Sequence, residues 1–211
     1  YLLGIAALVG TVISTGTAQV LRYAKEDIQD GLYGFNGALA GIAVLCFFEL
    51  SVVTVLALIL SAALSTLIMR FLKNIVPPFT APFVLVTWGV MGQFLFVFDV
   101  SLLPSSEPTG DTFNILTASS NSFGQVMFQE NVITGLFFLS AIFVNNKLMA
   151  MYAVYAAVLG SLTGWFFSEP ISTVNAGLMG YNAILCAIAV SGQSRADFLW
   201  ATMAIMLSTL L

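Results

Sequence analysis

The sequence predicts an all-α polytopic membrane protein, built from inverted-topology repeats whose broken and re-entrant helices line a central pore. Three observations support this prediction. Of the 211 residues, 59% are hydrophobic and only 8% are charged, whereas soluble domains carry about 25% charged residues. The charges separate apolar stretches of roughly 20 residues, the length of a helix that crosses a bilayer. Finally, a short motif in the first half of the chain recurs in the second half.

The stretches without charges are predicted to span the membrane, because a charge at the bilayer centre costs on the order of 2.5–3.5 kcal/mol. The predicted spans cover residues 1–22, 31–48, 50–70, 79–98, 132–146, 148–168, 177–192 and 198–211. The polar stretch 99–123 is predicted to be a loop. The following residues, 124–131, are too few to span the membrane, and we expect them to dip into it and return.

The basic residues test this layout, because Lys and Arg concentrate on the cytoplasmic side of membrane proteins. With the re-entrant dip in place, all of them fall on one side, which is predicted to be cytoplasmic: Arg22, Lys25, Arg70, Lys73, Lys147 and Arg195. The loop 99–123 is then extracytoplasmic. It divides the chain into part of a first repeat, residues 1–98, and part of a second repeat, residues 124–211.

The repeated motif is G-L-x-G-(F/Y)-N-x-x-L, at residues 31–39 and 177–185. Counting the span that holds the first copy, five predicted spans lie between the starts of the two copies, so the second enters the membrane from the opposite face, as in transporters with inverted repeats. The motif predicts broken helix starts, where asparagine ties freed backbone groups together rather than touching a solute. The residues in question are Gly34, Asn36, Gly180 and Asn182. An alternative is that the glycines only let helices pack closely.

Each copy of the motif also carries an aromatic residue and a leucine four positions apart, so that both lie on one helix face. These pairs are Phe35 with Leu39 and Tyr181 with Leu185. Two such faces, related by a two-fold axis, predict a narrow slot with flat sides. A slot of this kind suits a small planar solute.

Polar side chains outside the motif are further candidates. Gln125 lies in the predicted re-entrant segment, where its amide can donate and accept hydrogen bonds without titrating, and Phe128 is predicted to share its helix face. Thr80 follows Pro77 and Pro78, which block a regular helix start and are expected to leave nearby carbonyls unpaired. The alternatives are an exposed loop glutamine, a packing phenylalanine and a helix-capping threonine.

The residues that the sequence lacks disfavour several classes of function. It contains no histidine and only two cysteines. No motif places a nucleophile beside a base or gathers metal ligands, so we expect no enzyme activity, no metal and no cofactor. The net charge of −4 gives no nucleic-acid binding surface. No acidic residue falls inside a predicted span, which disfavours coupling to protons or sodium ions.

Four segments, in order along the chain, resemble the urea transporter family, its bacterial branch most closely. They are residues 31–39, 77–83, 123–131 and 177–185. The resemblance implies a passive, selective urea channel in the bilayer of the inner (plasma) membrane, crossing it several times. It also implies a homotrimer with one pore per protomer, and that this chain is the middle portion of a member.

The resemblance further implies one set of pathway residues. They are Gln125, Val126 and Phe128 in an outer site, Thr80 at the centre, and Phe35, Leu39, Tyr181 and Leu185 in the slot. Tyr181 stands where phenylalanine is usual in the family. The competing functions are a channel for another small solute (ammonia or ammonium, formate, or water) and a non-conducting membrane assembly subunit.

The layout predicts opposite labelling of two engineered cysteines. In a variant without Cys46 and Cys186, Ser105→Cys is expected to react with a membrane-impermeant maleimide from outside, and Lys147→Cys only from inside. Intact cells and inverted vesicles provide the two measurements. Labelling of both positions from the same side would contradict the re-entrant segment, and the inverted repeat with it.

Overall fold

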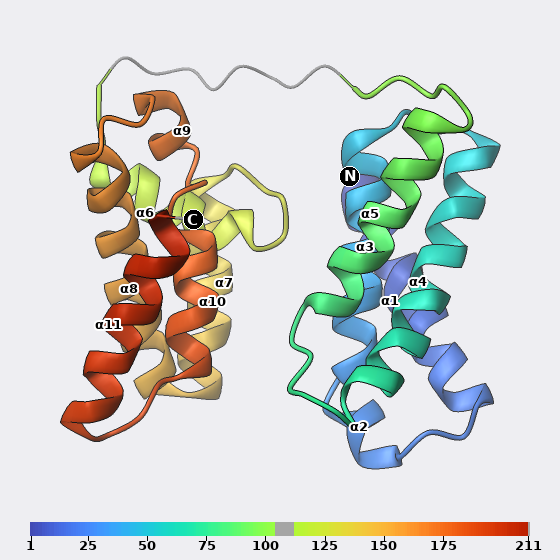
Figure 1. Cartoon of the computed structure of the whole chain (residues 1–211), viewed down its shortest axis with the longest axis horizontal. Helices are drawn as coiled ribbons and strands as arrows, with labels where there is room; N and C mark the ends of the chain where they lie inside the picture. The colour runs from blue at the N-terminus through green and yellow to red at the C-terminus, as the bar shows by residue number, and fades with distance from the viewer. Residues whose placement is uncertain (104–111, 211) are drawn as a thin grey trace. The chain divides into compact units, whose positions relative to one another are not determined.

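The computed structural model describes residues 1–103 and 112–210. Every regular element among them is a helix (Figure 1), which confirms the predicted all-α class. The chain forms two compact units, Tyr1–Ser105 and Ser106–Leu211, each described by itself. The first contains α1 (Leu2–Val20), α2 (Lys25–Gln29), α3 (Leu32–Phe47), α4 (Val52–Leu72) and α5 (Ala81–Phe96). The second contains α6 (Ile115–Gln125), α7 (Val132–Asn145), α8 (Lys147–Phe166), α9 (Ile171–Asn175), α10 (Tyr181–Ala189) and α11 (Arg195–Leu210).

Three of these helices, α1, α4 and α8, are long and apolar enough to cross a membrane, and α3, α5 and α7 are apolar but shorter. Two sequence predictions are wrong. Residues 115–123 of the predicted loop are helical and belong to α6, while residues 104–111 of that loop lie outside the described residues. The predicted span 177–192 contains only the nine-residue α10. At 1.5 Å per residue α10 is about 14 Å long, less than half of a roughly 30 Å hydrocarbon core.

Polar caps explain where several of the helices begin. Asn114, Asn131 and Asn146 precede α6, α7 and α8, and each side-chain oxygen accepts hydrogen bonds from two backbone N–H groups of the first turn. These N–H groups have no partner within their own helix. Ser51 caps α4 through a reciprocal hydrogen-bonded pair with Thr54. The caps therefore set helix starts that the apolar pattern alone leaves open.

The first unit is built around α3, which packs against α1, α4 and α5. The buried residues of α1 are small and recur every four positions: Ala6, Gly10, Ser14 and Ala18. This stripe brings the two backbones together, because a Cβ atom on Gly10 would lie 2.1 Å from the carbonyl oxygen of Gly37 on α3. Small residues at such contacts allow the close packing that holds helices together in lipid.

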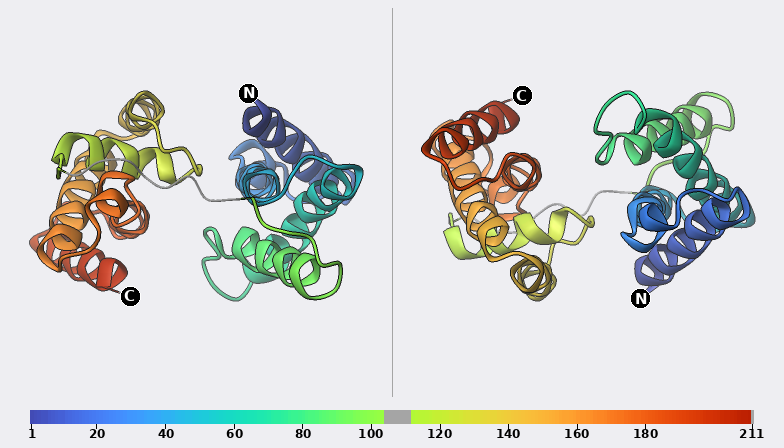
Figure 2. Two further views of the ribbon diagram at one scale, coloured as in Figure 1. Left: turned by 90° about the horizontal axis from the view of Figure 1, so that it is seen from above. Right: turned by 90° about the horizontal axis from the view of Figure 1, so that it is seen from below.

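The second unit packs α8 against α6, α7, α10 and α11, and Figure 2 shows both bundles from their ends. Its contact between α8 and α10 again depends on small residues. A Cβ atom on Gly160 would lie 2.9 Å from the carbonyl oxygen of Met179 and 3.4 Å from the Cβ atom of Ala183. The backbones of α8 and α10 therefore approach closely, as those of α1 and α3 do.

The order of elements around the two motif copies is the same. In the first unit the five-residue helix α2 leads through Gly31 into α3, and in the second unit the five-residue helix α9 leads through Gly177 into α10. Both glycines have a positive φ, 73° and 85°, which residues with a Cβ atom rarely adopt. Each motif copy thus begins at a left-handed turn.

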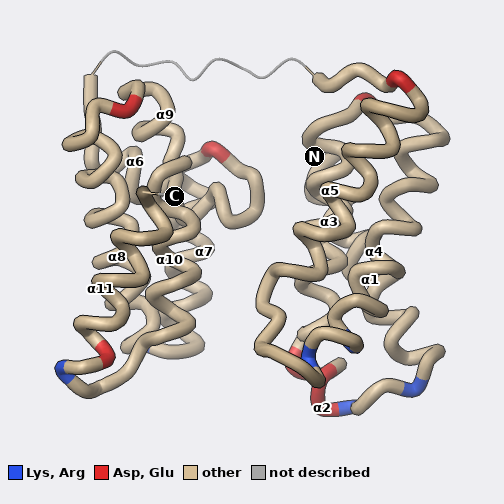
Figure 3. The backbone as a smooth tube through the Cα atoms, viewed as in Figure 1, with Lys and Arg blue, Asp and Glu red and all other residues tan. Residues whose placement is uncertain are grey.

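Charged residues lie at helix ends (Figure 3). In the first unit Arg22 follows α1, and Arg70 and Lys73 lie at the end of α4. Glu49 and Asp99 instead follow the ends of α3 and α5. Because α1 and α4 end where α3 and α5 begin, the basic residues and these two acids occupy opposite ends of the unit. The predicted membrane layout requires this distribution in the first half of the chain.

The contact between α1 and α3 predicts opposite effects of two alanine substitutions on one helix. Gly10→Ala forces α1 away from the Gly37 carbonyl and is expected to destabilise the protein by roughly 1–3 kcal/mol, as overpacking does. Gly16→Ala is the matched control, because nothing lies within 4 Å of its Cβ position, and we expect it to stabilise α1 slightly. Thermal unfolding of purified protein in detergent measures both. Equal unfolding midpoints would contradict the contact.

Candidate functional site

Gln125, the last residue of α6, has an amide whose orientation is fixed by the protein. Its Nε2 donates a hydrogen bond to the carbonyl oxygen of Ala176, at 3.0 Å. Its Oε1 has no hydrogen-bond partner in the part of the chain that the structure describes, and the side chain is half-buried. An amide held through its nitrogen presents its oxygen as an acceptor. The second unit therefore offers one oriented, neutral acceptor at this position.

Asparagines that the sequence analysis missed fasten α6 to the last residue of α9, Asn175. Asn121 lies one turn before Gln125 and donates to the carbonyl oxygen of Asn175, at 2.9 Å. The Asn175 side-chain oxygen accepts a hydrogen bond from the backbone N–H of Asn114, at 3.0 Å. Asn114, Asn121 and Gln125 are spaced by seven and four residues, so they lie on one helix face. This spacing of amide side chains is the sequence pattern that could have indicated the contact.

Gly177 continues this contact. A Cβ atom on Gly177 would lie 2.3 Å from the backbone nitrogen of Ser122 and 2.4 Å from the carbonyl carbon of Asn121. Its positive φ and this close approach both require glycine. The turn before α10 is consequently seated directly on α6, next to the Gln125 amide.

Val126 and Phe128 follow Gln125 but do not continue its helix. Val126 is buried, at 5% exposure. Phe128 has a φ of 56°, and its N–H donates to the Gln125 carbonyl oxygen, at 3.0 Å. The chain turns here, so the prediction that Phe128 shares a helix face with Gln125 is wrong. A left-handed residue after the last helical turn redirects the chain.

Phe35 stands out on α3. Every other residue from 33 to 45 is buried, whereas Phe35 is 39% exposed. Leu39 lies one turn further along α3 and is 1% exposed. The predicted slot face of Phe35 and Leu39 is therefore divided within the first unit, because neighbouring helices cover Leu39 and leave Phe35 open. Gly34, beside Phe35, is buried, and a Cβ atom there would lie 3.0 Å from the Thr15 hydroxyl oxygen.

Asn36 joins α3 to the proline-rich segment before α5. It is 1% exposed. Its Nδ2 donates to the carbonyl oxygen of Phe79 and its Oδ1 accepts from the N–H of Phe83, both at 3.1 Å. The side chain thus ties these backbone groups together and holds the segment that carries Thr80.

Thr80 occupies the N-cap position of α5, and its side chain makes no capping hydrogen bond. Pro82 fits the first turn, where its missing N–H has no helical partner in any case. The expectation of unpaired carbonyls near Thr80 is wrong. The carbonyl oxygens of Pro78 and Thr80 accept from the N–H groups of Ala81 and Val84, at 2.9 and 3.1 Å, and Asn36 supplies the partner for Phe79.

The second motif copy is more open than the first. Tyr181 and Leu185 are half-buried and lie one turn apart on α10, while Asn182 is exposed and makes no hydrogen bond among the described residues. Asn182 therefore does not repeat the bridging contacts of Asn36 within the second unit. Gly180 is buried, and a Cβ atom there would lie 2.3 Å from the hydroxyl oxygen of Ser122 on α6.

These motifs and their surroundings match a known family over the whole chain. The family model described as urea transporter matches residues 1–211. The chain belongs to the urea transporter family. Urea transporter 1 of Rattus norvegicus is 31% identical over 209 aligned positions, which cover 89% of this chain and 54% of the relative. Urea transporter 1 of Ovis aries is 30% identical with the same coverage. The chain thus spans about half the length of these relatives.

Membership of the urea transporter family confirms the resemblance that the four segments carry. The described residues contain no group of three or more Cys, Asp or Glu side chains placed to hold a metal ion. The chemistry available around Gln125, Phe35 and Thr80 is hydrogen bonding and aromatic contact.

The bridge formed by Asn36 predicts a loss of stability when its amide is removed. Asn36→Ala removes the part-buried hydrogen bonds to the Phe79 carbonyl and the Phe83 N–H, and a typical hydrogen bond contributes about 0.5–1.5 kcal/mol. Asn145→Ala is the control, because Asn145 is exposed at the end of α7. Thermal unfolding in detergent is expected to show a lower midpoint for Asn36→Ala alone. Identical midpoints for the two variants would contradict the bridge.

Proposed function

We propose that this chain forms the urea pathway of a passive channel, which conducts urea across the membrane down its gradient. The observation that carries the proposal is the Gln125 amide, which is anchored through Nε2 and keeps Oε1 without a partner among the described residues. Membership of the urea transporter family and the printed names of the relatives support urea as the solute.

The proposed chemistry follows from the urea molecule. Urea is planar, with one acceptor oxygen and four N–H donors, and an N–H that loses water without gaining a partner costs about 1–3 kcal/mol by protein mutational data. The Gln125 oxygen accepts such an N–H. Because the Ala176 carbonyl already holds the amide, little side-chain freedom is lost when urea binds.

The remaining pathway residues are assigned from their exposure. Phe35 and Tyr181 supply aromatic faces for the plane of urea, Phe128 is assigned with Gln125 to the outer site, and Thr80 supplies a hydroxyl. Leu185 is half-buried and is the leucine that we assign to the wall. Leu39 and Val126 are buried, and we assign them to the packing that supports the pathway.

The passive mechanism is the one favoured by the charge distribution. The apolar helices α1, α3, α4, α5, α7 and α8 contain no Asp or Glu, and carriers that couple to protons or cations usually place such residues within the membrane. The neutral lining that we propose does not replace the hydration of an ion, so ions are excluded.

The assembly that we propose is a homotrimer in the inner membrane, with one pore per protomer and two inverted repeats in each protomer. The repeated order of a long helix, a five-residue helix, a left-handed glycine and the motif helix supports the repeat. Inverted repeats of this kind place broken helices at a midplane site.

The proposal predicts that Gln125→Leu lowers urea flux about tenfold or more. Without the Gln125 oxygen, a urea N–H that has lost its water has no acceptor, which costs on the order of 1.4 kcal/mol. Stopped-flow uptake of urea into proteoliposomes of the full-length protein measures the flux, normalised to folded protein. Gln19→Leu is the control, since Gln19 is exposed at the end of α1. Adding a proton or sodium ionophore is expected to leave wild-type flux unchanged.

Wild-type flux in Gln125→Leu would remove this residue from the pathway. A flux that collapses with the ionophore would point instead to a coupled carrier. No urea-specific flux in the wild-type protein would favour another small solute.

A further inference from the structure

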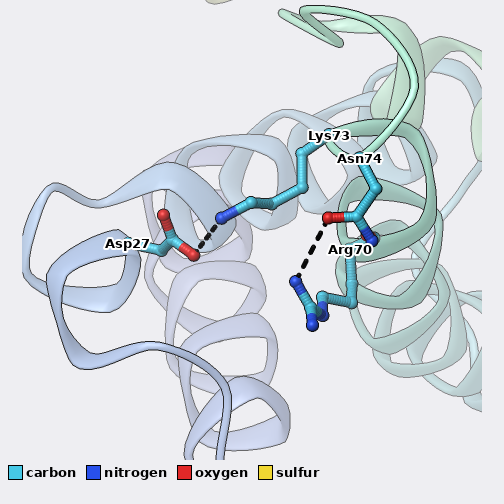
Figure 4. A network of polar contacts seen from close by, with 4 residues as sticks. All are labelled: Asp27, Arg70, Lys73 and Asn74. Atoms are coloured by element: carbon cyan, nitrogen blue, oxygen red, sulfur yellow. Dashed lines mark hydrogen bonds and ion pairs between the residues drawn. The ribbon is translucent and has the colours of Figure 1, made fainter.

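The five-residue helix α2 is held by an ion pair at the end of α4 (Figure 4). The Lys73 ammonium contacts the Asp27 carboxylate, and the two side chains are 24% and 20% exposed. No residue of α2 is fully buried, and its Ile28 side chain packs against the cluster of Ala18, Tyr33 and Met69. A pair withdrawn from water to this degree is screened less by salt than a fully exposed one. The ion pair is therefore a polar attachment of α2 to the end of α4, beside the apolar contact of Ile28.

Residues on one face of α4 stabilise both α2, which precedes the turn at Gly31, and the start of α3, which follows it. Thr66, Arg70 and Lys73 are spaced by four and three residues, so they share that face. Thr66 exchanges a hydrogen bond with Ser14, at 2.7 Å, and the Ser14 hydroxyl also contacts the carbonyl oxygen of Tyr33, at 2.7 Å. The start of α3 is thereby fixed to α1 and α4.

Arg70 occupies the middle of this face. Its guanidinium lies 5.5 Å from the ring centroid of Tyr23, within the range of a cation–π contact. The Tyr23 ring in turn lies 5.4 Å from the ring of Tyr33. Arg70 also donates to the side-chain oxygen of Asn74, at 3.4 Å. Figure 4 shows the Arg70 contact with Asn74 next to the ion pair of Lys73 and Asp27.

The turn that these contacts enclose leads directly to Phe35. Gly31 has a φ of 73°, its N–H donates to the Ile28 carbonyl oxygen at 3.1 Å, and its own carbonyl oxygen accepts from the N–H of Phe35 at 3.0 Å. The backbone is hydrogen-bonded continuously from α2 to Phe35. A displacement of α2 therefore acts on the first turn of α3, which carries Phe35, although the Ser14 and Thr66 hydrogen bonds also hold that turn.

We propose that Asp27 and Lys73 are positioning residues for Phe35. Their ion pair fixes α2 against α4, holds the left-handed turn at Gly31 and so sets the direction in which α3 presents the exposed Phe35 ring. The consequence for transport rests on the proposed function, in which Phe35 contacts urea. The position of Phe35 itself does not rest on that function.

The test therefore measures position and transport separately in the full-length protein. Phe35→Cys, in a variant without Cys46 and Cys186, reports position through the rate at which a small thiol reagent labels it. Asp27→Asn and Lys73→Met are expected to change this rate roughly two- to fivefold, the factor that ion pairs of this exposure contribute in double-mutant cycles. With Phe35 intact, we expect the same two variants to raise the half-saturating urea concentration more than they lower the maximal flux.

Matched controls separate the ion pair from a general loss of structure. Glu26→Gln removes a charge from an exposed residue of the same helix and is expected to leave labelling and flux unchanged. Lys73→Arg keeps the pair and is expected to retain wild-type behaviour. The exchange Asp27→Lys with Lys73→Asp restores opposite charges and is expected to recover the labelling rate.

Unchanged labelling of Phe35→Cys in both single variants would overturn the proposal. An effect of Glu26→Gln equal to that of Asp27→Asn would also overturn it, because the effect would then belong to net charge. Altered labelling with wild-type urea flux in Asp27→Asn would support the role of the ion pair in positioning and overturn the role of Phe35 in the urea pathway.

Discussion

Side-chain amides that bond to the backbone where helices break are the contacts on which both units depend. In an apolar solvent, every backbone N–H and C=O needs a partner within the protein, and a break in a helix removes such partners. Asn36 supplies both kinds of partner to the segment before α5. In the second unit Asn121 and Gln125 bond to consecutive carbonyls before α10. The candidate pathway residues lie next to these amides, because the breaks are where the chain leaves regular helix.

The two motif copies share a turn but are attached by different means. The helix α2 is charged and contacts Lys73 at the end of α4, whereas α9 has no charged residue and its last residue, Asn175, bonds to Asn121 of α6. The surroundings of the two left-handed glycines differ accordingly. Nothing lies within 4 Å of the Cβ position of Gly31, while that of Gly177 is filled by the backbone of α6. The motif therefore determines the local turn, and the neighbouring elements determine how it is held.

Charge placement and apolar length were sufficient to predict the all-α class and most of the long helices, because both are set by the bilayer. The helix α6 was predicted as loop over 115–123, since its Ser, Thr and Asn content resembles that of a polar connection, and only the cap at Asn114 marks its start. The four-residue spacing of Phe35 and Leu39 correctly places them on one helix. It says nothing about which helix covers Leu39, because burial depends on tertiary packing.

The way in which Gln125 is anchored makes the site favour hydrogen-bond donors over acceptors. Its nitrogen is engaged with Ala176, so the group can receive a hydrogen bond and has one fewer to give. Acetone has nearly the shape of urea but carries no N–H, and it would gain nothing from this oxygen. Size alone does not separate these two molecules, whereas the direction of one hydrogen bond does. A pathway with this amide thus distinguishes isosteres by donor content, without a charge or a moving part.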